Sequence, residues 1–212
     1  MSLRLAFFLL ALGLIVTSAP AFADNILYAN GPVNGICDIQ GCTADAWTIN
    51  VGFDISDSFN ISSDTTIHGF TFAVWVFPGV TVSAVDWAIG TCEECSDIAA
   101  GTANVTSTFL STNQFAFDIW SLSVSGLDVP VDSGTYWLTL QNAVSSTGDP
   151  VYWDENNGPS DAGNGSIGSI PSESFNIFGG GGSGSVPEPS SLLLFASSIV
   201  GVGALVRRKR LL

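Results

Sequence analysis

The chain has 212 residues, a formal net charge of −14 and a hydrophobic fraction of 46%. Residues 24–185 contain no Lys or Arg, and all but Glu188 of the 19 acidic residues lie there, so this part carries a net charge of −18 with His68 neutral. Because binding to nucleic acids and to anionic lipids depends on Lys and Arg, both ligand classes are excluded for residues 24–185.

Residues 1–23 have the layout of a secretory signal peptide. A positive region, Met1–Arg4, precedes an apolar run, Leu5–Val16, and the small residues that signal peptidase requires follow at Ala21–Ala23. The apolar run is short for an uncleaved anchor, so we expect cleavage before Asp24. The mature body would then begin at residue 24 and lie outside the cytoplasm.

Residues 24–178 consist of short strand patterns separated by turn residues. Apolar and polar residues alternate from Trp47 to Ile55, which predicts one strand with a buried and a wet face. Thr65–Phe77 is apolar at nearly every position from Phe70 onward, which predicts a central strand covered on both faces and ended by Pro78-Gly79. Ile26–Tyr28 is a short apolar patch followed by turn residues. Further strands are expected at Phe59–Ile61, Val80–Ile89, Ala103–Leu110, Phe115–Val124 with a bulge near Ile119, Thr135–Ala143, Val151–Trp153 and Phe175–Phe178.

This pattern indicates an all-β domain. No segment of the body has a helical period, and no repeat of 20–50 residues is present. Many short strands with turns between them are typical of an antiparallel β-sandwich, here jelly-roll-like, with a partly open barrel as the alternative. Residues 179–185, rich in Gly and Ser, would form a flexible linker after this domain.

Four cysteines lie in the body as two closely spaced pairs, Cys37 with Cys42 and Cys92 with Cys95. An exported protein meets an oxidising compartment, so two disulfides are expected, and we favour the two local loops among the three connectivities that the sequence allows. A zinc site made of all four thiolates is the alternative. A redox role for Cys92 and Cys95 is disfavoured, because Glu93 and Glu94 would raise the pKa of the thiols.

The stretch from Asp154 to Gly168 is an acidic loop rich in Gly and Asn. Its acids and their neighbours supply oxygen ligands of the kind that calcium takes, although the spacing does not match an EF-hand and no metal is assigned. Exposed aromatic side chains next to these acids would stack on sugar rings, whereas most Trp residues are in phase with core positions. The candidate glycan or metal loop comprises Asp149, Tyr152, Trp153, Asp154, Glu155 and Asp161.

The body lacks the residues that most catalytic sites need. No Lys or Arg is present to stabilise an anionic transition state, and His68 has no nucleophile elbow to serve. Two carboxylates facing each other across a cleft would be the remaining route, to glycoside hydrolysis. We therefore expect no enzymatic activity and assign no catalytic residue.

The last segment, residues 186–212, has three parts in a fixed order. The signature at its start and the basic cluster at its end enclose an uncharged apolar run, residues 190–206, at the lower end of the ~17–25 residues that span a bilayer as a helix. The basic cluster would stay on the cytoplasmic side, which places the body outside. The signature and the cluster are Val186, Pro187, Glu188, Pro189, Arg207, Arg208, Lys209 and Arg210.

This order of parts resembles the PEP-CTERM sorting tail of Gram-negative bacteria; an ordinary membrane anchor is the alternative. The resemblance implies export across the inner membrane, cleavage by an exosortase near the Pro-Glu-Pro, and a final place at the cell surface or in the extracellular polysaccharide. In the body, Ile55–Phe59, Val85–Trp87, Gly134–Ala143 and Gly148–Asn157 resemble ectodomains that recur on PEP-CTERM proteins and imply no particular activity. We expect a structural or adhesive role, with carbohydrate binding as the alternative and glycoside hydrolysis after it.

Overall fold

The computed structural model describes residues 25–34 and 46–180. The predicted signal peptide, the Cys37 and Cys42 pair, and the sorting tail with its helix at 190–206 lie outside these residues. In the described part the chain forms thirteen strands and no helix, which confirms the predicted all-β class with more strands than the sequence pattern indicates. Accordingly, no helix in residues 25–34 and 46–180 is long and apolar enough to cross a membrane.

The first of two antiparallel sheets, sheet A, is built around β4. β4 pairs with β8 along one edge, and β7 continues the sheet beyond β8. The other edge of β4 pairs first with β13, which leads to β1, and then with β10, which leads to β2. The seven strands are β1 (Asn25–Ala29), β2 (Ala46–Thr48), β4 (Thr65–Val76), β7 (Thr106–Thr112), β8 (Asp118–Val131), β10 (Tyr152–Asp154) and β13 (Phe175–Gly179).

The second sheet, sheet B, has the order β12-β11-β3-β9-β5-β6. Its long strands β3 and β9 pair without a break from Asp54 to Ile61. β11 and β12 form a small hairpin that extends the edge at β3. The six strands are β3 (Asp54–Ile61), β5 (Val82–Gly90), β6 (Ala99–Asn104), β9 (Gly134–Ser145), β11 (Ala162–Asn164) and β12 (Gly168–Ile170).

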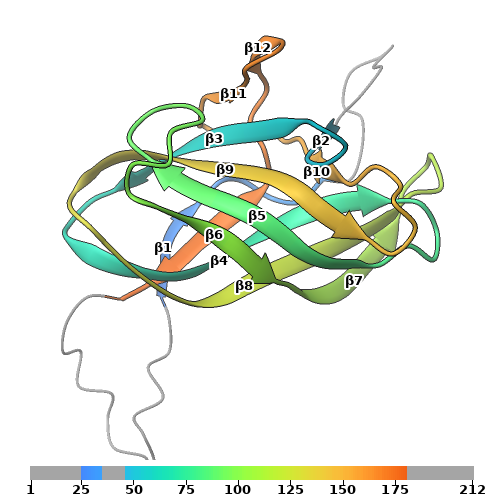
Figure 1. The fold of residues 1–212 in the computed structure, drawn as a ribbon, viewed down its shortest axis with the longest axis horizontal. Coiled ribbons are helices and arrows are strands. Elements are labelled where there is room, and N and C mark those ends of the chain that lie inside the picture. The colour runs from blue at the N-terminus through green and yellow to red at the C-terminus, as the bar shows by residue number, and fades with distance from the viewer. Residues whose placement is uncertain (1–24, 35–45, 181–212) are drawn as a thin grey trace, which may run out of the picture. The chain divides into compact units, whose positions relative to one another are not determined.

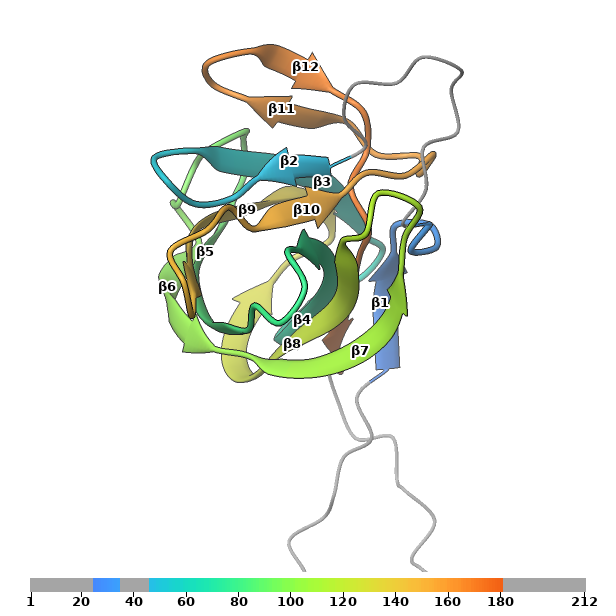
Figure 2. The ribbon, with the colours of Figure 1, turned by 90° about the vertical axis from the view of Figure 1, so that its right-hand side faces the viewer.

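The two sheets curve around a common interior, as Figures 1 and 2 show. Side chains from both sheets meet there, and the largest fully buried ones include Phe59 of β3, Phe70 and Phe72 of β4, Trp153 of β10 and Phe175 of β13. Aromatic rings pack edge to face across this interior, with the Trp153 and Phe175 centroids 5.8 Å apart. The fold is therefore a two-sheet antiparallel β-sandwich.

The predicted central strand is confirmed. Phe70, Phe72, Val74 and Val76 of β4 face the interior, and Trp75 on the opposite face is buried against Ile119. The predicted strands at Val80–Ile89, Thr135–Ala143 and Phe175–Phe178 are likewise present as β5, β9 and β13.

The predicted single strand from Trp47 to Ile55 is wrong. β2 ends at Thr48, and the chain turns at Val51 and Gly52, whose φ angles are 50° and 92°. The Phe53 N–H donates to the Asn50 carbonyl oxygen across this turn at 3.1 Å. Val51 is therefore 60% exposed and Phe53 44% exposed, so the apolar alternation continues through a turn whose side chains do not reach the core.

The predicted strand at Ala103–Leu110 is two strands in different sheets. β6 pairs with β5 in sheet B, and β7 pairs with β8 in sheet A. The chain changes sheet at Val105, whose N–H donates to the Ser83 carbonyl oxygen at 3.1 Å. Both strands lie at sheet edges, which explains why this stretch is less apolar than the others.

A bulge is present at the level of Ile119, as predicted, but the strand that carries it is β7 and not β8. β8 pairs with β4 without interruption from Asp118 to Ser125, and the extra residue at this level is Leu110 on β7. The irregularity of the pairing of β8 with β4 lies farther on, between Ser125 and Val129. Phe115 and Phe117 belong to the turn before β8, so their alternation with Ile119 does not mark a strand.

Candidate functional site

A groove of about 540 Å³ lies on the outer face of sheet B. Its floor comes from β3, β9, β5 and β6, on the face opposite the core residues Val85 and Ile89. The polar side chains that line it are Asp54, Asp86, Glu94, Ser96, Thr102, Thr139 and Gln141.

Strand register places the floor residues in rows across the sheet. Asp54 is opposite Gln141, Gln141 is opposite Asp86, and Asp86 is opposite Thr102. Neighbouring strands are about 4.8 Å apart, so this row of carboxylate, amide and hydroxyl groups spans about 14 Å. The next row contains Ser56, Thr139 and the small Ala88 and Ala100, which leave space above the floor.

Hydrogen bonds hold the floor side chains in place. Both oxygens of Asp86 accept a bond, one from Thr102 Oγ1 at 2.5 Å and the other from Asn142 Nδ2 at 2.9 Å. The hydroxyls of Ser56 and Thr139 lie 2.8 Å apart. These groups are thus fixed before any ligand arrives, which reduces the entropy lost on binding.

The turn from Cys92 to Cys95 forms a wall of the groove. Its two cysteines form the predicted disulfide, with Cα atoms 5.2 Å apart. Glu94, at φ 58°, donates its N–H to Ser56 Oγ at 3.0 Å. Gly163 and Gly165 lie directly against the carboxylates of Glu93 and Glu94, so the turn packs on the chain segment of β11 through positions that have no side chain.

Glu94, in this wall, has a raised pKa. Partial burial, followed by the negative charge of Asp54, raises the pKa of Glu94, while a hydrogen bond from the Gly165 backbone lowers it. The Asp54 and Glu94 carboxyl groups also share a side-chain hydrogen bond. The groove therefore offers a carboxyl pair, a fixed carboxylate and several neutral hydrogen-bonding groups, without any cationic residue.

The residues of the candidate glycan or metal loop do not form an exposed platform. Trp153 is 0% exposed, and its indole N–H donates to the Ser174 carbonyl oxygen at 2.9 Å, so the expectation of an exposed Trp153 is wrong. Asp154 is also buried and accepts a bond from the Trp75 indole N–H at 2.6 Å. The alternation along β10 explains this arrangement, because Trp153 faces the core between the sheets.

The other residues of that loop lie apart from one another. Tyr152 is half-buried against the ring of Phe117, with centroids 5.8 Å apart. Glu155 accepts a bond from the Trp47 indole N–H at 3.0 Å. Asp149 is held by Thr147 Oγ1 at 2.7 Å before β10, and Asp161 is exposed. Across the described residues, no three His, Cys, Asp or Glu side chains gather closely enough to hold a metal ion by themselves.

The structure shows a second polar cluster, at Asp57 and Glu173, that the sequence analysis missed. Asp57 lies between Ile55 and Phe59 on the inward face of β3, and Glu173 precedes the core residue Phe175 by two positions. Both side chains are 0% exposed. The signal was present in the sequence, because each acid is in phase with a core residue of its own strand or of the strand that follows.

Burial dominates the ionisation of this cluster. It raises the pKa of Asp57 to about 7, against the neighbouring Ser160 hydroxyl and the hydrogen bond from the Glu173 N–H, which both lower it. Burial also raises the pKa of Glu173 well above its usual value, and the charges of Asp57, Glu155 and Asp154 add to the effect. The same physics raises the pKa of Tyr28, through burial and then the charge of Asp57.

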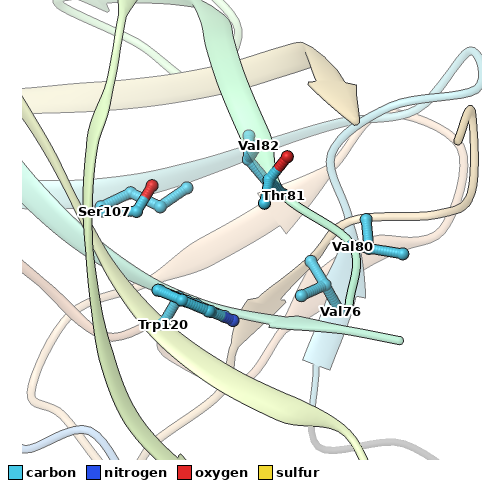
Figure 3. A pocket seen from close by; sticks show the side chains of 7 residues that line it. Val76, Val80, Thr81, Val82, Ser107 and Trp120 are labelled. Carbon is cyan, nitrogen blue, oxygen red and sulfur yellow. The ribbon is translucent and has the colours of Figure 1, made fainter. Parts of the chain in front are cut away.

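A small apolar cavity of about 20 Å³ remains between the sheets beside Trp120. Figure 3 shows its lining, in which Val76, Val80 and Val82 face Trp120 across the gap. This volume has room for about one water molecule. The cavity is a packing gap and not a ligand site.

One comparison with known proteins finds a match, and it lies in the tail. The PEP-CTERM protein-sorting motif matches residues 185–210, which covers the Pro-Glu-Pro at 187–189 and the basic cluster at 207–210. No curated protein matches the chain. The chain therefore carries a PEP-CTERM sorting motif, C-terminal in sequence to a β-rich body that fits an ectodomain.

Proposed function

We propose that this chain is an exported protein that an exosortase processes at the PEP-CTERM motif, leaving the body at the cell surface or in the extracellular matrix of a Gram-negative bacterium. The observation that carries this proposal is the motif at residues 185–210. The signal-peptide pattern of residues 1–23 and the apolar run at 190–206 support it, because they provide entry into the export route and a temporary membrane anchor.

The role that we propose for the body is structural or adhesive, in association with exopolysaccharide, and not catalytic. A jelly-roll-like sandwich without Lys or Arg suits a stable, soluble surface domain. In the groove, both oxygens of Asp86 are engaged by Thr102 and Asn142, an arrangement that suits hydrogen bonding better than general-base chemistry.

Processing is tested in a Gram-negative host with and without an exosortase. We expect the tagged wild-type chain to shorten and leave the inner membrane only when the exosortase is present. Replacing Pro187, Glu188 and Pro189 together by Ala should keep the chain at full length in the membrane, whereas Ser197→Ala in the same tail should behave as wild type. Identical size and location in all four cases would remove the proposal.

Carbohydrate binding is the second candidate, and the groove on sheet B is the observation that favours it. The row from Asp54 to Thr102 presents hydrogen-bond acceptors and donors to which the hydroxyls of a neutral sugar chain could bind. An anionic polysaccharide would be repelled by the carboxylates of the groove. Tyr152 and Trp153 are not part of this site, because neither lines the groove and Trp153 is buried.

Binding is tested with the full chain in mild detergent on immobilised neutral and anionic bacterial polysaccharides. We expect saturable binding to neutral glycans, reduced at least about tenfold in Gln141→Ala by the loss of about 1.4 kcal/mol of hydrogen bonding. Asn104→Ala is the matched control, since Asn104 lies on β6 outside the groove. Equal binding by both variants would show that the groove is not the glycan-binding site. Release of reducing ends from the glycan would show that the chain hydrolyses glycans.

A further inference from the structure

The polar cluster lies where β3 of sheet B meets segments that flank β1, β10 and β13 of sheet A. We name it the Asp57–Glu173 centre, and it consists of Asn30, Asp57, Asn156, Ser160, Ser172 and Glu173. Four separate pieces of chain meet there: the residue after β1, the middle of β3, the segment after β10 and the segment before β13. Ser160 Oγ and Ser172 Oγ are 2.8 Å apart, and Ser172 Oγ is 3.1 Å from Asn156 Oδ1.

Two carboxylates of this centre have oxygens without a partner. Glu173 is 0% exposed, and neither of its carboxylate oxygens has a hydrogen bond. Asp57 is equally buried; its Oδ2 accepts bonds from Asn30 Nδ2 at 3.0 Å and from the Glu173 N–H at 2.6 Å, while its Oδ1 has none. Burying a carboxylate without a partner costs several kcal/mol, so native proteins rarely leave one in this state.

The centre also has more acceptors than donors. Four oxygen atoms lie within 2.6–3.0 Å of the single nitrogen Asn30 Nδ2: Asp57 Oδ2, Ser160 Oγ, Ser172 Oγ and the Glu173 carbonyl oxygen. An amide nitrogen carries two hydrogens and can serve about two of them. No Lys or Arg in residues 24–185 can supply the missing positive charge.

We propose that a divalent cation with the oxygen preference of calcium binds the Asp57–Glu173 centre. Two carboxylates match its charge, and neutral oxygens of Ser, Asn and backbone groups provide the remaining ligands, which calcium accepts in sets of about six to eight. Zinc does not fit, because the centre contains no sulfur or imidazole ligand.

The cation would stabilise the fold by crosslinking chain segments. It joins β3 to the segments that follow β1 and β10 and precede β13, so its removal would loosen these segments while the paired strands remain. This inference does not depend on the proposed function, because it concerns stability and not sorting or glycan binding.

The test measures thermal unfolding of the full chain in mild detergent, after chelation, at fixed ionic strength. Calcium should raise the unfolding midpoint of the wild type by about 5 °C or more at saturating concentration. Glu173→Gln, which keeps the shape and removes the orphan charge, should be folded and insensitive to calcium. Asp161→Asn, an exposed acid of the same region, should respond as the wild type does.

Metal content gives an independent measurement. After gel filtration in calcium, elemental analysis should find one calcium per wild-type chain above the content of the Glu173→Gln chain. If Glu173→Gln fails to fold, Asp57→Asn takes its place in both measurements. A wild-type midpoint that calcium does not move overturns the proposal, and so does an equal rise with magnesium in all variants, which would indicate charge screening by an acidic surface.

Discussion

Asp57 is an acid in the middle of a strand whose other inward side chains are apolar. Ile55 and Phe59 flank it on the same face of β3, and Leu138 lies opposite on β9. Its Oδ2 accepts hydrogen bonds from the Glu173 N–H and from Asn30 Nδ2, so Asp57 connects β3 to the segment before β13 and to the residue after β1. The Asp57 carboxyl group loses hydration on burial, which raises its pKa. The stability of the protein therefore depends on pH.

In the presence of chelator, the protein should lose stability as the pH rises from about 4 to about 7. The pKa of Asp57 is raised to about 7 in the folded state, whereas the unfolded chain titrates near the ordinary value of 3.8. Between these two values the folded state binds the extra proton, so each pH unit lowers the unfolding free energy by about 1.4 kcal/mol. Below pH 4 this contribution is complete, and above pH 7 it is gone.

Denaturant unfolding at a series of pH values checks this sign. Asp57→Asn should show a shallower slope than the wild type between pH 4 and 7, because the amide has no proton to lose. Asp128→Asn, at an exposed position of β8, provides the comparison for the general repulsion among surface acids. Stability that rises with pH in this window in the wild type would contradict the raised pKa.

Trp153 should matter for folding and not for ligand contact. Its ring packs edge to face on Phe72 and Phe175, with centroid distances of 6.2 and 5.8 Å, and it is fully buried. Trp153→Ala should lower the unfolding free energy by about 3–5 kcal/mol. Trp137→Ala, at a half-buried position on the outer face of sheet B, should cost clearly less. Comparable losses for the two variants in chemical denaturation would show that Trp153 is not a core residue.

At the scale of strands, local pattern predicted those elements that bury one or both faces along their whole length. β4, β5 and β9 combine apolar periodicity with turn residues at their ends, and these features depend only on neighbouring positions. The turn at Val51-Gly52 and the change of sheet at Val105 depend on which strand lies alongside. Alternation in a sequence carries no information about pairing partners, so it predicts one continuous strand across the turn and one across the change of sheet.

The groove escaped sequence analysis for a related reason. Asp54, Asp86, Thr102 and Gln141 come from four strands that are far apart in the chain, and register alone brings them into one row. The acidic stretch after Trp153 forms a recognisable pattern in the sequence because its residues are neighbours along the chain. The Cys92–Cys95 disulfide was predictable because the spacing of its cysteines is local.

Gly69 and Gly163 should differ in their tolerance of a methyl group. A Cβ atom on Gly69 of β4 would overlap the backbone oxygen of Val124 on β8, which cannot move without disturbing the ladder. A Cβ atom on Gly163 would meet the carboxylate of Glu93, the free end of a flexible side chain. Gly69→Ala should therefore lower the unfolding free energy by about 2–3 kcal/mol, and Gly163→Ala by less than about 1 kcal/mol. Equal midpoints in urea would refute this distinction.

The disulfide turn should matter more for the groove than for stability. Closing so short a loop stabilises the fold by about 2 kcal/mol in the chain-entropy description. Replacing Cys92 and Cys95 together by Ser should leave the body folded with that loss, while freeing Glu94 and Ser56 from their fixed positions. We expect glycan affinity to fall in this variant by a larger factor than in Asn104→Ala. Unchanged affinity would show that the wall takes no part in binding.

At the scale of the whole molecule, residues 24–185 contain 18 acids and no Lys or Arg. A net charge of −18 on this part disfavours the compact state through self-repulsion. Raising NaCl from about 10 mM to about 150 mM shortens the Debye length from about 30 to about 8 Å and should raise the unfolding midpoint by about 2–4 °C. The measurement is a melting series at neutral pH with chelator present. A midpoint that falls with salt would contradict it.

The place of β13 in sheet A has a mechanical consequence. This strand of five residues is the last of the body, and it lies between β1 and β4 instead of at an edge. A pull along its axis, applied through the chain that continues after Gly180, loads the hydrogen bonds on both sides of the strand at the same time. Such a joint fails in shear, when all bonds give way together, and not by unzipping one bond after another. A load applied through the C-terminal side of the body would thus pass directly into β4, the strand around which the rest of sheet A is assembled.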